Sequence, residues 1–380
     1  MKILKPKYEI LNESSITRKI ERIARICYKS ENLITEDSDM KMLNNLKKSN
    51  HLAMLEHANI VLNVNKSIYN SLFNLCEIIN NCIVETPNTS SIDTEDIIDI
   101  NTYKNNKHPG NTYLHFTNYI IADAKVIKSP ECIRYLVSGN IRAWYEFFNK
   151  ISNIEYFDTI YVDMKEFNFK ELYDIICNES KNIASVSEEA LNSKPFKLLF
   201  ELNNDINNNI KVIRDMNELS FKERMVHEYM TVIFTVDRGV THELVRMRDC
   251  SFAQESTRYC NYSKGKFNNE ITVIEPCFFV DNPDKYHIWE QSMLNAENSY
   301  FDLLAAGCTP QEARDVLPTS VKSDIAVTTH LNEWYHIFNL RACDATGAAH
   351  PQMSEVMRPL LIECKEKYPF AFNNLIIPNK

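Results

Sequence analysis

Four cations surround one loop of the sequence, which also carries hydroxyl and amide side chains. The cations are Arg246, Arg248, Arg258 and Lys264, and the polar side chains are Gln254, Glu255, Ser256 and Thr257. Guanidinium groups are always charged and can donate hydrogen bonds in pairs, which suits a phosphate. Glu255 could hold an arginine in place, while the hydroxyls and the amide could address a sugar or a base. A solvated charged turn is the alternative, but the apolar residues Phe252 and Ala253 favour packing.

A second group of candidate residues lies nearer the C-terminus. Its members are Arg314, at a predicted helix end before a proline, Arg341, at the end of an amphipathic helix, and the histidines His330, His336 and His350. A lone histidine is more often a helix-surface or core residue than a catalyst. The spacing of His330 and His336 places them on different helix faces, so we predict no metal site.

The hydrophobic periodicity predicts an α+β fold with most of its helix late in the chain. The predicted helices cover residues 14–30, 38–49, 68–82, 240–248, 284–306, 309–316, 328–342 and 352–367, and the predicted strands cover 58–64 and 230–236. Asp237-Arg238-Gly239 is a turn signal, and Pro351 is a favoured helix opener. The short helix 240–248 leads directly into the loop of arginines.

The pattern divides the chain into three parts. Residues 1–66 form a first part, residues 67–225 read as a large, mainly helical insertion, and residues 226–380 carry the loop and the C-terminal helices. The insertion includes a polar, breaker-rich segment at 86–110.

Composition excludes several classes of protein. A net charge of −9 argues against a nucleic-acid-binding protein, which would need a basic surface. The eleven cysteines contain no Cys-x-x-Cys pair, which is typical of reduced thiols rather than of a disulfide framework or a zinc site. No signal peptide or membrane-spanning segment is evident, so we expect a cytoplasmic protein with no membrane association.

One stretch of sequence echoes another. Residues 138–149, Ser-Gly-Asn-Ile-Arg-Ala-Trp-Tyr-Glu-Phe-Phe-Asn, share Trp, Tyr, Phe and Asn at identical spacing with residues 328–339, Thr-Thr-His-Leu-Asn-Glu-Trp-Tyr-His-Ile-Phe-Asn. Two amphipathic helices that are alike by chance and a true duplication explain this equally well.

The loop of arginines resembles the signature of the flavin-dependent thymidylate synthases, which is Arg-His-Arg, seven residues, then Ser. This chain has Arg246-Met247-Arg248, seven residues, then Ser256, followed by Thr257-Arg258-Tyr259. Other segments resemble the family in the family's order, namely 24–28, 51–57, 241–245, 312–318, 332–336, 339–341 and 350–352. The insertion 67–225 lies outside the match, so 1–66 and 226–380 would form the catalytic domain.

The resemblance implies methylation of dUMP at C5 to give dTMP by a homotetramer with shared active sites. Methylenetetrahydrofolate would supply the carbon, and FAD reduced by NADPH would supply the hydride. The positions implied for dUMP are Glu243, Leu244, Val245, Arg246, Gln254, Glu255, Ser256, Thr257, Arg258, Arg314 and Arg341. Arg341, at the pyrimidine, and Ser256 are the implied catalytic positions. Those implied for FAD are Cys27, His51, Ala53, Arg246, Met247, Arg248, Gln254, His330, Leu331, Asn332 and His336.

The chain departs from the family at three positions. Met247 replaces the signature histidine, His330 stands where Asn is usual, and Asn332 replaces a frequent Arg. The echo at 140–142, Asn-Ile-Arg, is closer to the family's flavin triplet, but order along the chain favours 330–332. A homologue that binds nucleotide or flavin with impaired turnover is therefore the alternative to an active synthase. A cysteine-dependent synthase would have to use Cys277, which lacks that family's surrounding residues.

Overall fold

The computed structural model describes residues 1–79, 82–85, 114–120, 133–154, 167–202, 207–258 and 260–378. The predicted breaker-rich segment 86–110 and Tyr259 of the signature lie outside these residues. The chain forms two units: unit 1 comprises 1–13, 21–38 and 230–380, and unit 2 comprises 14–20 and 39–229. The predicted insertion, residues 67–225, therefore lies entirely within the residue range of unit 2.

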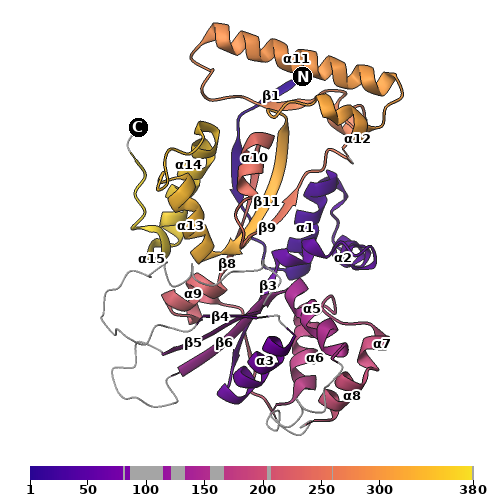
Figure 1. Ribbon diagram of the computed structural model, residues 1–380, viewed down its shortest axis with the longest axis vertical. Helices are drawn as coiled ribbons and strands as arrows, with labels where there is room; N and C mark the ends of the chain where they lie inside the picture. The colour runs from indigo at the N-terminus through magenta and orange to yellow at the C-terminus, as the bar shows by residue number, and fades with distance from the viewer. Residues whose placement is uncertain are drawn as a thin grey trace. The chain divides into compact units, whose positions relative to one another are not determined.

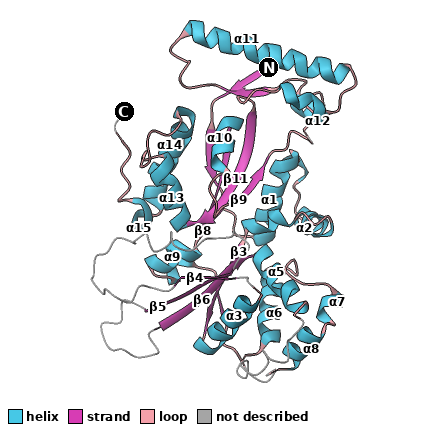
Figure 2. Ribbon diagram, in the orientation of Figure 1, coloured by secondary structure: helices cyan, strands magenta, loops and turns pink. Residues whose placement is uncertain are grey.

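Unit 1 is built on a four-stranded sheet in the order β2-β8-β11-β9 (Figures 1 and 2). The β2–β8 and β9–β11 pairs are antiparallel, and β1 pairs with β10 in a separate parallel ribbon. The strands are β1 (Lys2–Leu4), β2 (Lys7–Ile10), β8 (Tyr229–Asp237), β9 (Ser251–Gln254), β10 (Thr272–Ile274) and β11 (Lys322–His330). The helices are α10 (Arg238–Leu244), α11 (Pro283–Ala305), α12 (Pro310–Ala313), α13 (Leu331–Arg341), α14 (Pro351–Lys367) and α15 (Pro369–Phe372). Helix α1 (Ile16–Tyr28) enters unit 1 at Glu21.

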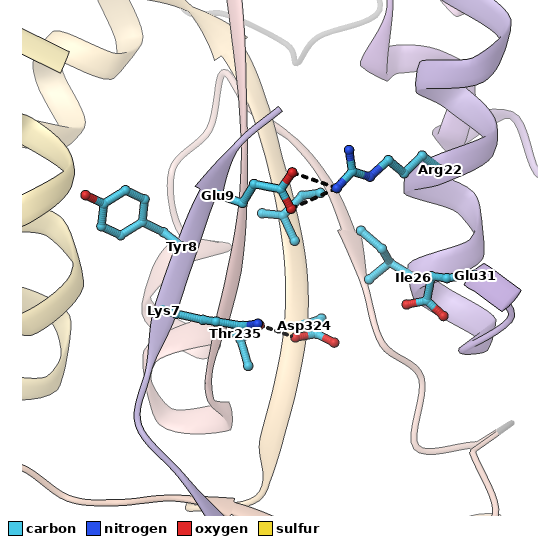
Figure 3. Close-up of a pocket in the computed structure, with 9 residues that line it drawn as sticks. Lys7, Tyr8, Glu9, Arg22, Ile26, Glu31, Thr235 and Asp324 are labelled. Atoms are coloured by element: carbon cyan, nitrogen blue, oxygen red, sulfur yellow. Dashed lines mark hydrogen bonds and ion pairs between the residues drawn. The ribbon is translucent and has the colours of Figure 1, made fainter. Parts of the chain in front are cut away.

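Side chains on consecutive residues of β2 identify the two faces of this sheet, because neighbours along a strand point to opposite faces. Glu9 accepts from Arg22 of α1 at 2.6 Å, whereas Tyr8 lies beside Glu363 of α14. Figure 3 shows Tyr8 and Glu9 pointing to opposite sides of β2. The sheet of unit 1 therefore has α1 on one face, here named the α1 face, and α14 on the other.

The core of unit 1 centres on Trp334, which is fully buried. Its indole nitrogen donates to the carbonyl oxygen of Met230 at 3.0 Å, and its ring packs against Phe234 and Phe338. An indole buried with its N–H satisfied stabilises a core without leaving an unpaired donor. Helix α13 is thereby fixed against β8.

Unit 2 contains a five-stranded sheet in the order β4-β5-β6-β3-β7. Strand β3 pairs antiparallel with β6 and β7, β5 pairs antiparallel with β6, and β4 pairs parallel with β5. The strands are β3 (Asn59–Val64), β4 (Cys82–Glu85), β5 (Leu114–Ile120), β6 (Ile133–Asn140) and β7 (Lys211–Ile213). The helices are α2 (Ser38–Lys48), α3 (Lys66–Ile78), α5 (Ile141–Ser152), α6 (Phe169–Glu179), α7 (Glu188–Leu191), α8 (Lys194–Glu201) and α9 (Phe221–His227). The described residues of the segment 67–225 thus form helices as predicted but also four strands, which the sequence did not indicate.

Most of the strongly periodic elements are confirmed. Helices α1, α2, α11 and α14 and strands β3 and β8 lie within two residues of their predicted bounds, and Pro351 opens α14. The predicted helix 68–82 ends at Ile78, and that at 309–316 is the short α12 followed by a 3-10 turn over Arg314–Val316.

Two boundary predictions near the functional residues were wrong. Residues 328–330 are the end of β11, so the helix predicted from 328 begins at Leu331. Because the second half of β11 is buried on both faces, it shows no alternation that would mark a strand. The predicted turn at Asp237–Gly239 is instead the start of α10, and α10 ends at Leu244 rather than at Arg248.

Candidate functional site

Helix α10 delivers the first arginines of the signature. Asp237 caps it by accepting from the backbone N–H of Val240 at 2.9 Å, which satisfies a free donor of the first turn. The helix stops at Leu244, so Arg246 and Arg248 lie on the following turn and are exposed, while Met247 between them is 8% exposed. The turn therefore presents two guanidinium groups and buries the residue that replaces the signature histidine.

Strand β9 places two consecutive signature residues on opposite faces of the sheet. The Gln254 side-chain nitrogen donates to Thr241 of α10 at 2.9 Å and to Ser323 of β11 at 3.0 Å. The Glu255 carboxylate lies on the α1 face, where Lys322 donates to it at 2.6 Å. The side chains of Gln254 and Glu255 therefore cannot both face one bound nucleotide.

The loop after β9 is tied to the end of α1. The backbone N–H of Ser256 donates to the carbonyl oxygen of Cys27 at 3.1 Å, and the Ser256 hydroxyl accepts from the N–H of Arg258 at 3.3 Å. Thr257 is buried and Arg258 is exposed. Cys27, predicted at the flavin, is thus brought next to Ser256, predicted at the nucleotide.

Arg341 at the end of α13 is joined directly to α10. One of its terminal nitrogens lies 2.9 Å from the carboxylate of Glu243, and its Nε is buried and makes no hydrogen bond within the described residues. Two predicted substrate positions far apart in the sequence are thereby in contact. Val245 is exposed and Leu244 buried, while Arg314 is half-buried at the 3-10 turn after α12.

The predicted flavin positions at the start of α13 are mostly buried. His330 caps the helix, since its Nδ1 accepts from the N–H of Glu333 at 3.2 Å, and it is 1% exposed. Leu331 is fully buried, His336 is half-buried, and Asn332 has a buried Oδ1 that makes no hydrogen bond in the described part of the chain. His51 and Ala53 are exposed in unit 2, beside and within the 3-10 turn Leu52–His57.

A buried carboxyl lies beside these positions. Burial, together with the nearby Asp249, raises the pKa of Glu333 to about 8. Asp249 follows Arg248 directly in the signature turn. At neutral pH the Glu333 side chain therefore remains largely protonated and neutral.

A cavity of about 200 Å³ opens on the α1 face (Figure 3). It is lined by Lys7, Tyr8, Glu9, Arg22, Ile26, Glu31, Ile233, Thr235 and Asp324. None of the predicted nucleotide or flavin residues lines it, and it is smaller than the roughly 300–1,000 Å³ of typical ligand pockets. We therefore do not assign it to the nucleotide.

Sequence reasoning missed five residues that bond the signature loop to its surroundings. They are Lys29, Thr241, Lys322, Ser323 and Asp324. Three of them lie on β11, no part of which was predicted as a strand. An alternating Lys-x-Asp pattern at 322–324 was the available signal.

Other chemistry is not supported by the described residues. Burial raises the pKa of the Cys277 thiol to about 11, and Glu355 adds to this, whereas a cysteine nucleophile must ionise readily. Among the residues that the structure describes, no group of three His, Cys, Asp or Glu side chains could hold a metal ion. None of the described helices is long and apolar enough to span a membrane.

A four-stranded sheet flanked by helices carries guanidinium groups at the ends of two of them, an arrangement suited to a small anionic ligand. Residues 175–370, more than half of the chain, match the family model described as thymidylate synthase complementing protein, and the chain belongs to this family.

Relatives and a solved structure extend the comparison. A flavin-dependent thymidylate synthase from Pyrococcus abyssi is 33% identical over 129 residues, covering 33% of this chain and 52% of that protein. One from Saccharolobus solfataricus is 27% identical over 167 residues, covering 42% of this chain and 61% of that protein. The chain thus spans about half the length of the first of these relatives. A UMP/dUMP methylase from Streptomyces cacaoi, bound with 5-Br dUMP, aligns with 39% of this chain and 70% of its own at 22% identity, with a TM-score of 0.34 that is too low to bear on function.

Proposed function

We propose that this chain catalyses the reductive methylation of dUMP at C5 to give dTMP. Carbon would come from methylenetetrahydrofolate and reducing equivalents from NADPH, and the enzyme would act as a cytoplasmic homotetramer with active sites shared between subunits. One observation carries the proposal: Glu243 of α10 and Arg341 of α13 form an ion pair, beside a helix end that presents Arg246 and Arg248. The family assignment and the named relatives support it.

The phosphate of dUMP suits the exposed arginines. Arg246 and Arg258 are exposed and Arg314 is half-buried, so all three can reach a ligand. A charge-assisted hydrogen bond contributes about 1.5–3 kcal/mol, so two or three such contacts would anchor a nucleotide monophosphate. Leu244 and Val245 would complete the nucleotide contacts at the end of α10, with Gln254, Ser256 and Thr257 beyond the turn.

Arg341 would act at the pyrimidine. Attack by C5 requires negative charge on the ring, and a guanidinium beside N3 would stabilise that charge as N3 loses its proton. Glu243 holds the Arg341 side chain in place, so the charge is oriented before the substrate arrives. Ser256 would orient the nucleotide through its hydroxyl.

The residues present fit an FAD whose isoalloxazine supplies the hydride once NADPH has reduced it. Arg246 and Arg248 are cations suited to its pyrophosphate, and the buried Asn332 Oδ1 is an acceptor without a hydrogen bond in the described residues. Cys27, Met247, Gln254, Leu331 and His336 of unit 1 and His51 and Ala53 of unit 2 remain predicted flavin positions.

Release of tritium from C5-labelled dUMP tests the proposal. Wild-type protein with NADPH and methylenetetrahydrofolate should release tritium, and omission of FAD from the stripped protein should abolish release. Absence of release from protein that holds FAD and dUMP would refute catalysis.

A second candidate is a homologue that binds nucleotide or flavin with impaired turnover. It is favoured by Met247 and His330, which depart from the family pattern and are both buried. Their side chains are 8% and 1% exposed. The same tritium assay separates the two candidates. A bound flavin that NADPH reduces without any tritium release would support this one.

A further inference from the structure

The loop Ser256–Arg258, here named the nucleotide loop, begins just beyond the edge strand of the sheet. Strand β9 lies at the edge of the sheet of unit 1, and its last residue is Gln254. Beyond it, the N–H of Glu255 still donates to the carbonyl oxygen of Asp324 at 2.8 Å, and the N–H of Ser256 turns to Cys27. Ser256 therefore lies outside the regular ladder, and the conformation of its loop depends on other contacts.

The side chain of Glu255 supplies such contacts. It is 3% exposed, and its Oε2 accepts from Lys322 at 2.6 Å and from the N–H of Asp324 at 3.3 Å. Lys29, just past the end of α1, lies 3.6 Å from the same oxygen. Oε1 makes no hydrogen bond within the described residues, so Oε2 makes the contacts that fix the Glu255 side chain.

Asp324 completes a cluster of two lysines and two carboxylates, and the more exposed Glu31 lies 3.5 Å from Lys29 at its margin. It forms ion pairs with Lys29 and with Lys322, the latter at 3.1 Å, and its other oxygen accepts from Thr235 at 2.6 Å. Burial would raise the pKa of Asp324, but Lys322 and Lys29 outweigh it and lower the pKa to about 2. Asp324 therefore stays charged at neutral pH, and its ion pairs with both lysines are present there.

The backbone is shaped to bring Lys29 to this cluster. Lys29 has a φ of 49°, in the left-handed region that non-glycine residues seldom adopt. The cluster therefore joins three separate segments: the end of α1, strand β11 and the nucleotide loop. Buried ion pairs of this kind fix geometry more than they add stability.

We propose that Glu255 is a positioning residue, clamped by Lys322 and Lys29 on the α1 face so that the loop at Ser256–Arg258 is held ready for the nucleotide. The inference rests on the proposed function, since that loop is the proposed dUMP site. This positioning role takes the place of the direct contact between the Glu255 carboxylate and dUMP that the sequence predicted.

The test compares Glu255→Gln and Lys322→Met with the wild type. Gln keeps the shape of Glu255 and removes its charge, while Met keeps much of the length of Lys322 and removes its ammonium. Lys322→Arg is the conservative rescue. Arg22→Gln is the matched control, because it breaks the Arg22–Glu9 pair on the same face without touching the loop.

Two readouts are measured on folded full-length protein: the Kd and KM for dUMP, and hydrogen exchange of the backbone amides of Glu255 and Ser256. We expect both variants to raise the KM for dUMP about tenfold with a smaller change in kcat, and to speed exchange at the two amides about tenfold. Lys322→Arg should restore most of both, and Arg22→Gln should alter neither.

Unchanged exchange and a dUMP affinity within about twofold of wild type in either variant would overturn the proposal. If one variant fails to fold, the other decides. A purely structural role would lower the melting temperature while leaving dUMP affinity of the folded protein intact, which also counts against it. Wild-type protein that binds no dUMP would refute the proposed function. The exchange measurements would still test whether Lys322 and Glu255 hold the loop in place.

Discussion

Two strand-to-helix junctions, one in each unit, share their local structure and differ in the residues that could do chemistry. In unit 2, β6 runs into α5, and Asn140 caps the helix by accepting from Ala143 at 2.8 Å. In unit 1, β11 runs into α13, and His330 caps in the same way. Trp144 and Trp334, at equal distance from the two caps, are both fully buried. The sequence echo is therefore also a structural repeat.

A second pair of junctions repeats the correspondence. Asn65 follows β3 and accepts from the N–H of Ile68 at 2.9 Å at the start of α3. Asp237 is the last residue of β8 and accepts from the N–H of Val240 at the same distance at the start of α10. Each unit thus holds two capped junctions, which favours duplication over chance similarity.

The residues that differ are those of the proposed site. At the spacing where α13 carries Arg341, α5 carries the fully buried Ile151. At the spacing where α10 carries Glu243, α3 carries the buried Ser71. The caps and core aromatics are enough to make the junction. Ile151 and Ser71, at the matching positions of unit 2, cannot form the ion pair that orients Arg341. The repeat therefore separates residues that build the fold from residues that would act on a ligand.

The largest expected effect follows from replacing Arg341 with Ala. Loss of a charge placed where negative charge develops lowers kcat by about 100- to 1,000-fold, while dUMP binding weakens only modestly. Arg142→Ala in unit 2 is the control, since Arg142 pairs with Glu56 and Glu146 within unit 2. Tritium release measures both. Near-normal turnover of Arg341→Ala would remove its role at N3. A large loss in Arg142→Ala would show that its ion pair with Glu56, in the turn that carries Ala53, also matters for turnover.

The sequence could predict Arg341 and the signature loop because motif order needs no knowledge of the fold. It could not predict the Glu255–Lys322 contact, because that depends on the register in which Gln254 faces Ile325 across β9 and β11. Strand β11 itself was missed, since its second half is buried on both faces and lacks alternation. Amphipathic elements were predicted correctly because each has one solvent-exposed face, which gives its sequence a periodic pattern.

The segment 67–225 also shows which elements the sequence could predict and which it could not. Its helices are amphipathic and were expected, but two of its strands, β6 and β7, pair with β3, which lies outside the predicted insertion. Pairing between residues as distant as Asn59 and Asn140 leaves no local mark in the sequence. The proposed domain limits at 66 and 225 remain a prediction.

Acidification should affect the two junctions in opposite directions. Burial, with His115 nearby, lowers the pKa of His227 in unit 2 to about 3, so its contribution to stability is present above pH 6.5 and is lost as pH falls. The pKa of Glu333 in unit 1 is raised to about 8, so its contribution is full below pH 4.5 and is lost as pH rises.

Between pH 7 and pH 5, unit 2 should therefore lose about 2 kcal/mol of local stability while unit 1 gains a similar amount. The contrast arises because burial disfavours the charged form of each group, which is the protonated form of His227 and the deprotonated form of Glu333. Hydrogen exchange at α5 and α13 across this range is the measurement. His227→Gln and Glu333→Gln should each flatten one of the two profiles, and parallel profiles in the wild type would contradict the assignment.

The smallest effect should come from the caps, and it separates scaffold from site most directly. Asn140→Ala removes one capping hydrogen bond and should cost about 1 kcal/mol in chemical denaturation, with FAD content and tritium release unchanged. His330→Ala removes the matching cap at a similar stability cost, but it also alters a predicted flavin position, so FAD retention should fall. Absorbance of the purified proteins near the flavin bands compares the two. If Asn140→Ala lost FAD and His330→Ala retained it, the flavin triplet would have to be assigned to 140–142, and the roles of the two junctions would be reversed.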